Sequence, residues 1–448
     1  MADQEVQKIQ GTPQQIREKA KEALSSQGGL ATVSKTLSDL LKMPNLKYFG
    51  SEKEEMIERR DDYISNSQFA TSRQTMKNDL LLLINLLSSS NDITANAQAQ
   101  KERLQSLIDQ NLAIVLEKTR LLEKSWKELS LFYANAAQRE IRNLVVINAN
   151  FKKVDEDVII KKITDMVTEA NSSAIDMSKS FSLMAAPNYL GQPLIEKLST
   201  LAYKNKVLFL TDYLDLESVD SVLETANEEG RPKLGGVEKI WSRTVVFTNY
   251  GLLRDKHPQE KKILFGSPTA AVAGKLYDMK NLAQPIAGAQ HGPVKGFNGL
   301  HFKVNQEQTN RLDAENMNPM TLAFGSIMPF NCLTLFKGEN VELKQYSVIR
   351  TLDYIDKLLK HFLNQYVFTS MLDSDKKQHV YETILRMLKD LEDLKILKKG
   401  RITYFDIDKN QPDRFDIRLS LIPMFVTSAF DYSIGIDDNG VTESPENV

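Results

Sequence analysis

The stretch Phe265–Tyr277 reads FGSPTAAVAGKLY and decides how the rest of the chain is interpreted. It is rich in small residues and contains Gly-Lys, as a phosphate-binding P-loop does. A P-loop has the form G-x-x-x-x-G-K-[ST], because four residues curl the backbone N–H groups around the phosphates and the final hydroxyl holds magnesium. Here seven residues separate Gly266 from Gly274, and Leu276 follows Lys275. The count argues against a P-loop, and the elements on either side favour a small-residue helix start packed closely on a sheet, without a nucleotide.

The composition describes a globular chain with balanced charge. Its 448 residues exceed what one hydrophobic core usually supports, so two or three lobes are expected. The 57 basic and 59 acidic side chains nearly cancel, which leaves no overall field to attract nucleic acid or an anionic membrane. The single cysteine, Cys332, excludes an internal disulfide framework and suits a reducing compartment. We therefore expect protein partners and no nucleic acid.

The N-terminal sequence predicts a cytoplasmic protein with no direct membrane insertion. MADQEVQKIQGTPQQ lacks the basic segment and the apolar segment of a secretory signal. The longest apolar run, Leu80–Leu87, is far shorter than the roughly 20 residues of a membrane helix.

A short amphipathic helix is expected at Pro13–Ser26. Ile16, Ala20 and Leu24 form a narrow apolar stripe on an otherwise charged segment. The stripe suits a helix that docks to a partner, and it equally suits a solvated or partly disordered helix.

A longer helix and then an α/β region follow. Apolar residues recur at helical spacing from Leu104 to Leu129 and predict one long core-facing helix or two in series, with Trp126 as a core anchor. Leu144–Asn148 reads LVVIN, which is typical of a buried strand. Further strands are expected at 207–210, 244–248 and 263–265, a helix at 216–227 and a glycine-rich surface loop at 284–300. The alternation predicts a mixed or parallel sheet covered by helices.

The C-terminal part has the clearest pattern. Val348–Phe362 forms one apolar face, with the i,i+4 pairs Asp353–Lys357 and Asp356–Lys360 on the other. A second helix is expected to end at Lys398–Gly400. The alternating apolar residues of two expected strands are Phe415, Ile417, Leu419 and Leu421, and then Phe430, Tyr432, Ile434 and Ile436. The acidic residues 438–448 predict a disordered tail.

Few residues carry catalytic chemistry. The five histidines form no zinc-binding pattern, and no G-x-S-x-G nucleophile motif occurs. His291 lies in the glycine-rich loop and is the one histidine considered as catalytic, but a solvated or structural histidine is the expected reading. Asp406 and Asp408 share a strand face and suit either a cation or a charged strand edge. We expect no catalytic, cofactor-binding or metal-binding residues, and no cofactor.

Three segments together resemble the contractile tail sheath family. FGSPTAAVAGKLY resembles the sheath block that starts a helix of the core domain, and Val348–Phe368, VIRTLDYIDKLLKHFLNQYVF, resembles the sheath helix that begins around an R-x-x-x-Y-I motif. Leu121–Val158, LLEKSWKELSLFYANAAQREIRNLVVINANFKKVDEDV, is similar to the LE-x-x-W-x-x-L helix and following strand of the type VI secretion sheath large subunit.

This resemblance implies a bacterial structural subunit that stacks in helical rings around an inner tube and contracts to drive the tube through a membrane. It implies as partners further copies of the chain, a small sheath subunit, the tube protein, a baseplate and an AAA+ unfoldase. The unfoldase would recognise a helix near the N-terminus, for which Ile16, Ala20 and Leu24 are the candidates. The strands at Phe415–Ile422 and Phe430–Ile436 would join neighbouring subunits or form a sheet within one subunit.

The expected architecture has three parts. They are a helical N-terminal region and arm at 1–120, an α/β mixed-sheet sheath core with flanking helices at 121–437 in one or two lobes, and the tail at 438–448. Residues 181–262 depart from the type VI pattern, so a single-component sheath of a phage-like or extracellular particle is the alternative. A nucleotide-binding enzyme that uses residues 266–275 is an alternative of another class.

Overall fold

The protein is described by a computed structural model, in which contacts divide the chain into a unit at Met1–Glu117 and a unit at Lys118–Val448. The structure describes residues 66–75, 78, 93–136, 144–147, 157–172, 180–228, 233–369, 374–408, 411, 414–427, 434–436 and 441–443. The candidate unfoldase helix with Ile16, Ala20 and Leu24, and the candidate strand residues Phe430 and Tyr432, lie outside these residues.

A single long helix, α5, spans Ile93–Asn135 and confirms the helix predicted from the apolar spacing. Its predicted burial is wrong for much of its length. Trp126, expected as a core anchor, is 66% exposed, and Leu122 is 73% exposed. Burial begins only near the end of the helix, at Glu128 and Leu131. Helical spacing shows which residues share a face, but it does not show whether this chain covers that face.

The central sheet is mixed and confirms the predicted fold class. Its five strands run in the order β1-β2-β3-β7-β8; the first four are parallel and β8 is antiparallel to β7. Their bounds are β1 Leu183–Ala186, β2 Leu208–Asp212, β3 Thr244–Thr248, β7 Asn318–Ala323 and β8 Ser326–Pro329. Every residue of β2 and β3 is buried, as the apolar runs predicted.

Helices cover both faces of this sheet. On one face Phe209 and Val246 pack with the helices α6 (Asp157–Ser172), α7 (Gln192–Asn205) and α8 (Val219–Asn227). On the other face Leu210 and Phe247 pack with α9 (Pro268–Asp278) and with Leu131 of α5. Alternate residues of β2 and β3 therefore enter two different apolar clusters, as expected for strands buried on both sides.

A three-stranded sheet in the order β5-β4-β6 joins the central sheet to α9. Its strands are β4 Gly251–Arg254, β5 Leu264–Gly266 and β6 Gly299–Leu300, and β5 leads directly into α9. Four short elements complete this part of the described chain: η4 Lys239–Arg243 before β3, and then α10 Gly288–His291, α11 Gln306–Ala314 and η5 Val341–Leu343. The segment predicted as a surface loop at 284–300 therefore contains α10 and β6, and its Ile286 is fully buried.

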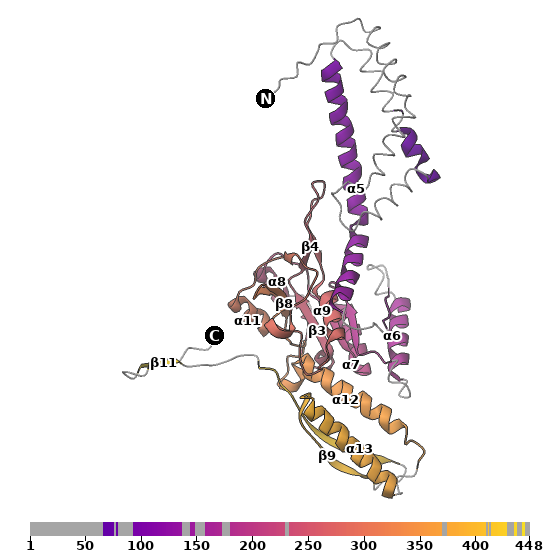
Figure 1. Cartoon of the computed structure of the whole chain (residues 1–448), viewed down its shortest axis with the longest axis vertical. Coiled ribbons are helices and arrows are strands. Elements are labelled where there is room, and N and C mark those ends of the chain that lie inside the picture. Colours follow the sequence, from indigo (N-terminus) through magenta and orange to yellow (C-terminus); the bar gives the residue numbers. More distant parts are fainter. Residues whose placement is uncertain are drawn as a thin grey trace. The chain divides into compact units, whose positions relative to one another are not determined.

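The C-terminal part forms its own apolar cluster. The helices α12 (Tyr346–Asn364) and α13 (Ser374–Asp393) lie beside the antiparallel strands β9 (Leu397–Ile407) and β10 (Phe415–Pro423) (Figure 1). Side chains of α13, led by Ile384 and Leu388, pack against β9 and β10. The strand predicted at 415–422 is confirmed.

Three local predictions are wrong. Residues 144–147 of LVVIN form no strand, and all four side chains are exposed. The helix α13 ends at Asp393, and Lys398–Gly400 belong to β9 instead of a helix end. Within the predicted disordered tail, Val441–Glu443 forms β12, which pairs with β11 (Ile434–Ile436). The second error follows from the pairing of β9 with β10, a partner about 20 residues later in the chain that the local helix-end pattern does not contain.

Candidate functional site

The start of α9 is held by two buried carboxylates of the same chain. Asp212, the last residue of β2, accepts hydrogen bonds from the Thr269 backbone N–H at 3.0 Å and the Thr269 hydroxyl at 2.7 Å, and from the Ser267 hydroxyl. It also accepts the Asn188 backbone N–H at 2.7 Å. Glu128 of α5 accepts the Ser267 N–H at 2.9 Å and the Asn188 side-chain amide at 3.1 and 3.2 Å. Strand β2, α5 and α9 therefore meet at one polar cluster.

This cluster argues against a phosphate site in the segment after β5. A helix N-terminus attracts anions because its first N–H groups lack partners within the helix. Here Asp212 and Glu128 already provide the negative charge at the start of α9. Burial raises the pKa of Asp212 to about 6, against the hydrogen bonds from Ser267 and Thr269, and burial also raises the pKa of Glu128. A phosphate at this position would have to displace or neutralise both carboxylates.

Gly274 lets α9 lie directly against α5. A Cβ atom at this position would be 2.2 Å from the carbonyl oxygen of Phe132, a backbone atom of α5. The residues from Pro268 to Gly274 are all buried, which confirms the predicted close packing of this stretch. The glycine that looked like part of a P-loop is therefore a contact point between two helices.

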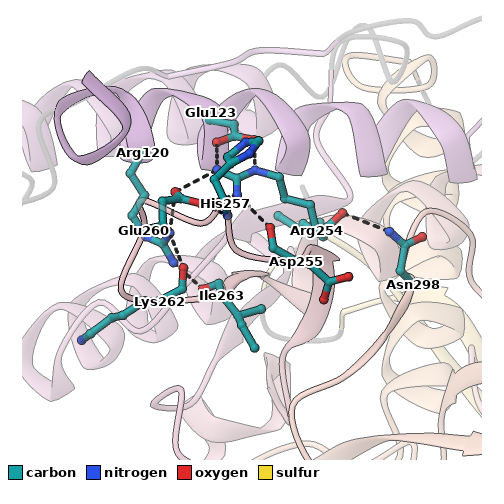
Figure 2. A network of polar contacts seen from close by, with 10 residues as sticks. Arg120, Glu123, Arg254, Asp255, His257, Glu260, Lys262, Ile263 and Asn298 are labelled. Carbon is teal, nitrogen blue, oxygen red and sulfur yellow. Dashed lines mark hydrogen bonds and ion pairs between the residues drawn. The ribbon is translucent and has the colours of Figure 1, made fainter. Parts of the chain in front are cut away.

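A second polar cluster, which we call the Arg254 network, joins α5 to the segment between β4 and β5. Figure 2 shows Arg120 and Glu123 on α5 directed toward Arg254 and Glu260. Arg254 donates from Nε and Nη2 to the two oxygens of Glu123, both at 2.6 Å. It donates from Nη1 and Nη2 to Glu260 at 2.5 and 3.0 Å, and from Nη1 to the Asp255 carbonyl at 2.9 Å. These bonds use all five N–H groups of the guanidinium.

Arg120 completes the network. It donates to Glu260 at 3.3 Å and to the Lys262 carbonyl at 3.1 Å, and also to the Ile263 carbonyl. The hydrogen bonds from Arg254 lower the pKa of Glu260 to about 2 and lower the pKa of Glu123. The positive guanidinium groups of Arg120 and Arg254 thus pair with the negative carboxylates of Glu123 and Glu260. These ion pairs link α5 to the segment between β4 and β5.

An exposed apolar surface lies beside the Arg254 network. Leu122, Trp126, Leu129 and Tyr133 recur along α5 at intervals of four, three and four residues, and we call these four residues the α5 stripe. Trp126 and Leu122 are largely exposed, Tyr133 is 46% exposed and Leu129 is half-buried. Apolar side chains that share a helix face in this way are typical of a surface that meets another helix.

The structure does not bring together the residues that the sequence suggested for catalysis or for cation binding. His291 ends α10 and is half-buried, and Asp406 pairs with Lys377 at 2.7 Å. Within the described ranges, no group of three or more metal-binding side chains occurs. Likewise, no described helix is long and apolar enough to cross a membrane.

The strand candidates are partly accounted for by packing within the chain. Ile417, Leu419 and Leu421 lie on β10 and pack against the cluster formed with α12 and α13, and Phe415 stacks edge-on against Phe405 of β9. These four side chains therefore pack within this subunit. In the described residues, β9 and β10 pair only with each other, so each has one edge without a neighbouring strand.

The sequence interpretation missed both polar clusters. Glu123 and Arg254 are 131 residues apart, and Asp212 and Thr269 are 57 apart, so no local spacing connects them. One signal was present for Asp212. An aspartate that ends the buried run LFLTD must find partners inside the protein, because a buried carboxylate without hydrogen bonds is costly.

Comparisons with known proteins agree with this architecture. Residues 114–337 match the family model "Type VI secretion system TssC/VipB, central domain", and residues 345–444 match "TssC/VipB-like, C-terminal domain". A sequence search of curated proteins finds no match.

Two solved structures share the fold at low identity. A chain of the anti-feeding prophage (AFP) baseplate, 6-fold symmetrised, is 14% identical with a TM-score of 0.51 over 69% of this chain and 80% of that one. A chain of the AFP helical sheath in the contracted state is 13% identical with a TM-score of 0.50 over 69% and 81%. The two family matches together span most of the described core, and the chain therefore belongs to the TssC/VipB family of type VI secretion system contractile sheath proteins.

Proposed function

We propose that this chain is the large subunit of a type VI-like sheath that polymerises around an inner tube in the bacterial cytoplasm and contracts to propel the tube through a target membrane. The two family matches carry this proposal. The work of such a subunit is mechanical. Contraction would draw on the difference between two packings of the subunit interfaces, without nucleotide chemistry in the sheath. The carboxylates at the start of α9 support a role without a nucleotide.

The α5 stripe is the proposed docking surface for a small sheath subunit. Its spacing of three and four residues suits a helix of the partner that packs side by side with α5. Burying Trp126 and Leu122 in such an interface would remove two largely exposed apolar side chains of α5 from water.

The β9–β10 pair is the proposed contact between copies of the chain. Ile417, Leu419 and Leu421 hold β10 on α13, so the strand edge can accept a strand from a neighbour without loss of the internal packing. The strand at Ile434–Ile436 and the expected Phe430 and Tyr432 remain candidates for the same role. A contact of this kind is heterologous and does not close on itself, as stacked rings require.

Co-expression with the small sheath subunit tests the proposal. We expect tubules with a cogwheel cross-section by electron microscopy, and their persistent absence would count against a sheath role. Tubules formed by this chain alone would favour a single-component sheath. Pull-down assays with the tube protein, the baseplate and the AAA+ unfoldase would test the remaining partners, with Ile16→Asp and Leu24→Asp in the candidate unfoldase helix as matched variants.

A further inference from the structure

The helix α12 has a polar face that turns toward the rest of the protein instead of toward solvent. Four of its residues, at intervals of four, three and four, bind groups of residues 118–337, which we call the central part. We name these four residues the α12 polar stripe: Tyr346, Arg350, Asp353 and Lys357. Ile355, Leu359 and Phe362 pack instead in the apolar cluster of the C-terminal lobe, residues 346–423. Ile355 is nine residues from Tyr346, and at about 100° per residue the two sets lie on opposite sides of the helix.

The first half of the α12 polar stripe binds backbone groups of the central part. The Tyr346 hydroxyl accepts the Ile286 N–H at 2.8 Å and donates to the Ile286 carbonyl at 3.1 Å. Arg350 donates from Nη2 to the Leu276 carbonyl, in the last turn of α9, at 3.3 Å. A positive charge at this end of α9 suits the negative end of the helix dipole.

The second half of the stripe makes two-point contacts. Asp353 is buried and accepts from Nε and Nη2 of Arg243, in η4, at 2.8 and 2.5 Å. Lys357 donates to the Asn171 side chain of α6 at 3.0 Å and to the Phe181 carbonyl at 2.6 Å. Contacts of this kind fix an angle as well as a distance, which a single charge contact does not.

Apolar packing between the lobe and the central part is concentrated in the first turn of α12. Among the described residues of the lobe, Tyr346 is the one that belongs to the apolar clusters of the central sheet, and Val348 and Ile349 are buried beside it. Farther along the helix, Ile355 and Leu359 belong to the cluster of the lobe itself. Because apolar contact is not directional, one turn of it resists separation of the two parts more than it resists tilting of the lobe.

We propose that the α12 polar stripe sets the orientation of the C-terminal lobe on the central part, with Arg243, Asp353 and Lys357 as positioning residues. Compared with apolar side chains of similar volume, a buried ion pair adds little net stability. It does require one geometry, because its charges are costly to bury unless they meet. The lobe carries the hairpin of β9 and β10, so the same contacts fix where that hairpin lies.

Replacing the ion pair by apolar side chains separates orientation from stability. In Arg243→Met combined with Asp353→Leu the two-point contact is lost but most of the volume is kept, so the urea midpoint should stay close to that of the parent. Spin labels at Glu196→Cys on α7 and Arg386→Cys on α13, both exposed positions, report the orientation in a Cys332→Ala background. We expect the distribution of label distances to become about twofold wider or more.

A second ion pair provides the matched control. Lys337 and Glu315 pair at 2.7 Å within the central part, so Lys337→Met combined with Glu315→Leu should leave the label distances unchanged. Arg243→Lys is the milder test, because it keeps the charge and loses the two-point geometry, and we expect a smaller widening.

A parent-like distance distribution in both Arg243 variants would overturn the proposal, and so would equal widening in the control. A large fall of the urea midpoint with unchanged distances would also refute it, because the pair would then serve stability alone. The measurement uses this chain alone, so its result does not depend on whether the chain assembles into a sheath.

Discussion

Replacing Gly274 with alanine tests the closest helix contact in the structure. The added Cβ would be 2.2 Å from the Phe132 carbonyl oxygen and 2.9 Å from its carbon, whereas ordinary contact begins at 3.4 Å. The two helices would have to separate by about 1.2 Å. They resist this separation, because Glu128 ties α5 to the start of α9 and Leu131 packs in the same apolar cluster.

Two effects set the size of the change. Overpacking in a close-packed interior costs about 1–3 kcal/mol. Alanine is the better helix former by about 1 kcal/mol, which offsets part of that cost. The atoms that the new Cβ meets are backbone atoms of Phe132, which cannot rotate away, so the overpacking cost lies at the upper end of this range. We expect Gly274→Ala to lower the free energy of unfolding by about 2 kcal/mol, once the helix propensity is subtracted.

Urea unfolding of the full chain measures this change as a lower midpoint. Gly299→Ala is the matched control, because its Cβ would lie 3.6 Å from Leu252, an ordinary contact distance. The control should stay within about 0.5 kcal/mol of the parent. A Gly274→Ala protein with a midpoint equal to or above the parent would refute the close approach of α9 to α5.

Three further predictions follow from the two polar clusters and from α9. Val272→Asp buries a carboxylate without a partner at a fully buried position, costs several kcal/mol and should give insoluble protein, whereas unchanged melting would show that the segment is exposed. The pKa of Asp212 is raised from 3.8 to about 6, so between these pH values the folded state binds more protons than the unfolded state. The free energy of unfolding should therefore fall as pH rises through about 6. Asp212→Asn should flatten this pH dependence, as measured by urea titrations. The pKa of Glu260 is lowered from 4.5 to about 2, so its contribution to the free energy of unfolding is present above pH 4.5 and is lost as pH falls toward 2. Glu260→Gln should remove this acid-sensitive part of the stability. An unchanged dependence of stability on pH in acid would contradict the network.

The sequence predicted two strands of the central sheet, β2 and β3, because both are buried on both sides, and it missed β1, β7 and β8. A strand at 244–248 was expected and β3 spans Thr244–Thr248, all of it buried. In such a strand nearly every residue is apolar or bonded internally, so a short run of residues contains the whole signal. The amphipathic helix at 348–362 was predictable for a similar reason, since one face of α12 is buried in its own subunit.

Charged partners could not be predicted in the same way. Asp353 and Asp356 were expected to pair with lysines one turn later on α12, but Asp353 binds Arg243 at 2.5 Å and Asp356 binds Lys206 at 2.5 Å. Lys357 instead donates to the Phe181 carbonyl at 2.6 Å. Neighbours on a helix gain only about 0.2–0.5 kcal/mol from pairing, so a tertiary partner with better geometry replaces them.

The stretch at Phe265–Tyr277 has a small-residue pattern that the sequence shows and charged partners that it does not show. This explains its misleading likeness to a P-loop. A P-loop and a closely packed helix both need small residues, the first so that a phosphate can approach the backbone and the second so that another helix can. The difference lies in what supplies the negative charge at the helix start. Here the side chains of Asp212 and Glu128 supply it from β2 and α5. Because these groups belong to the chain itself, they tie the start of α9 to both the sheet and α5 and take the place that an exchangeable anionic ligand has in a P-loop.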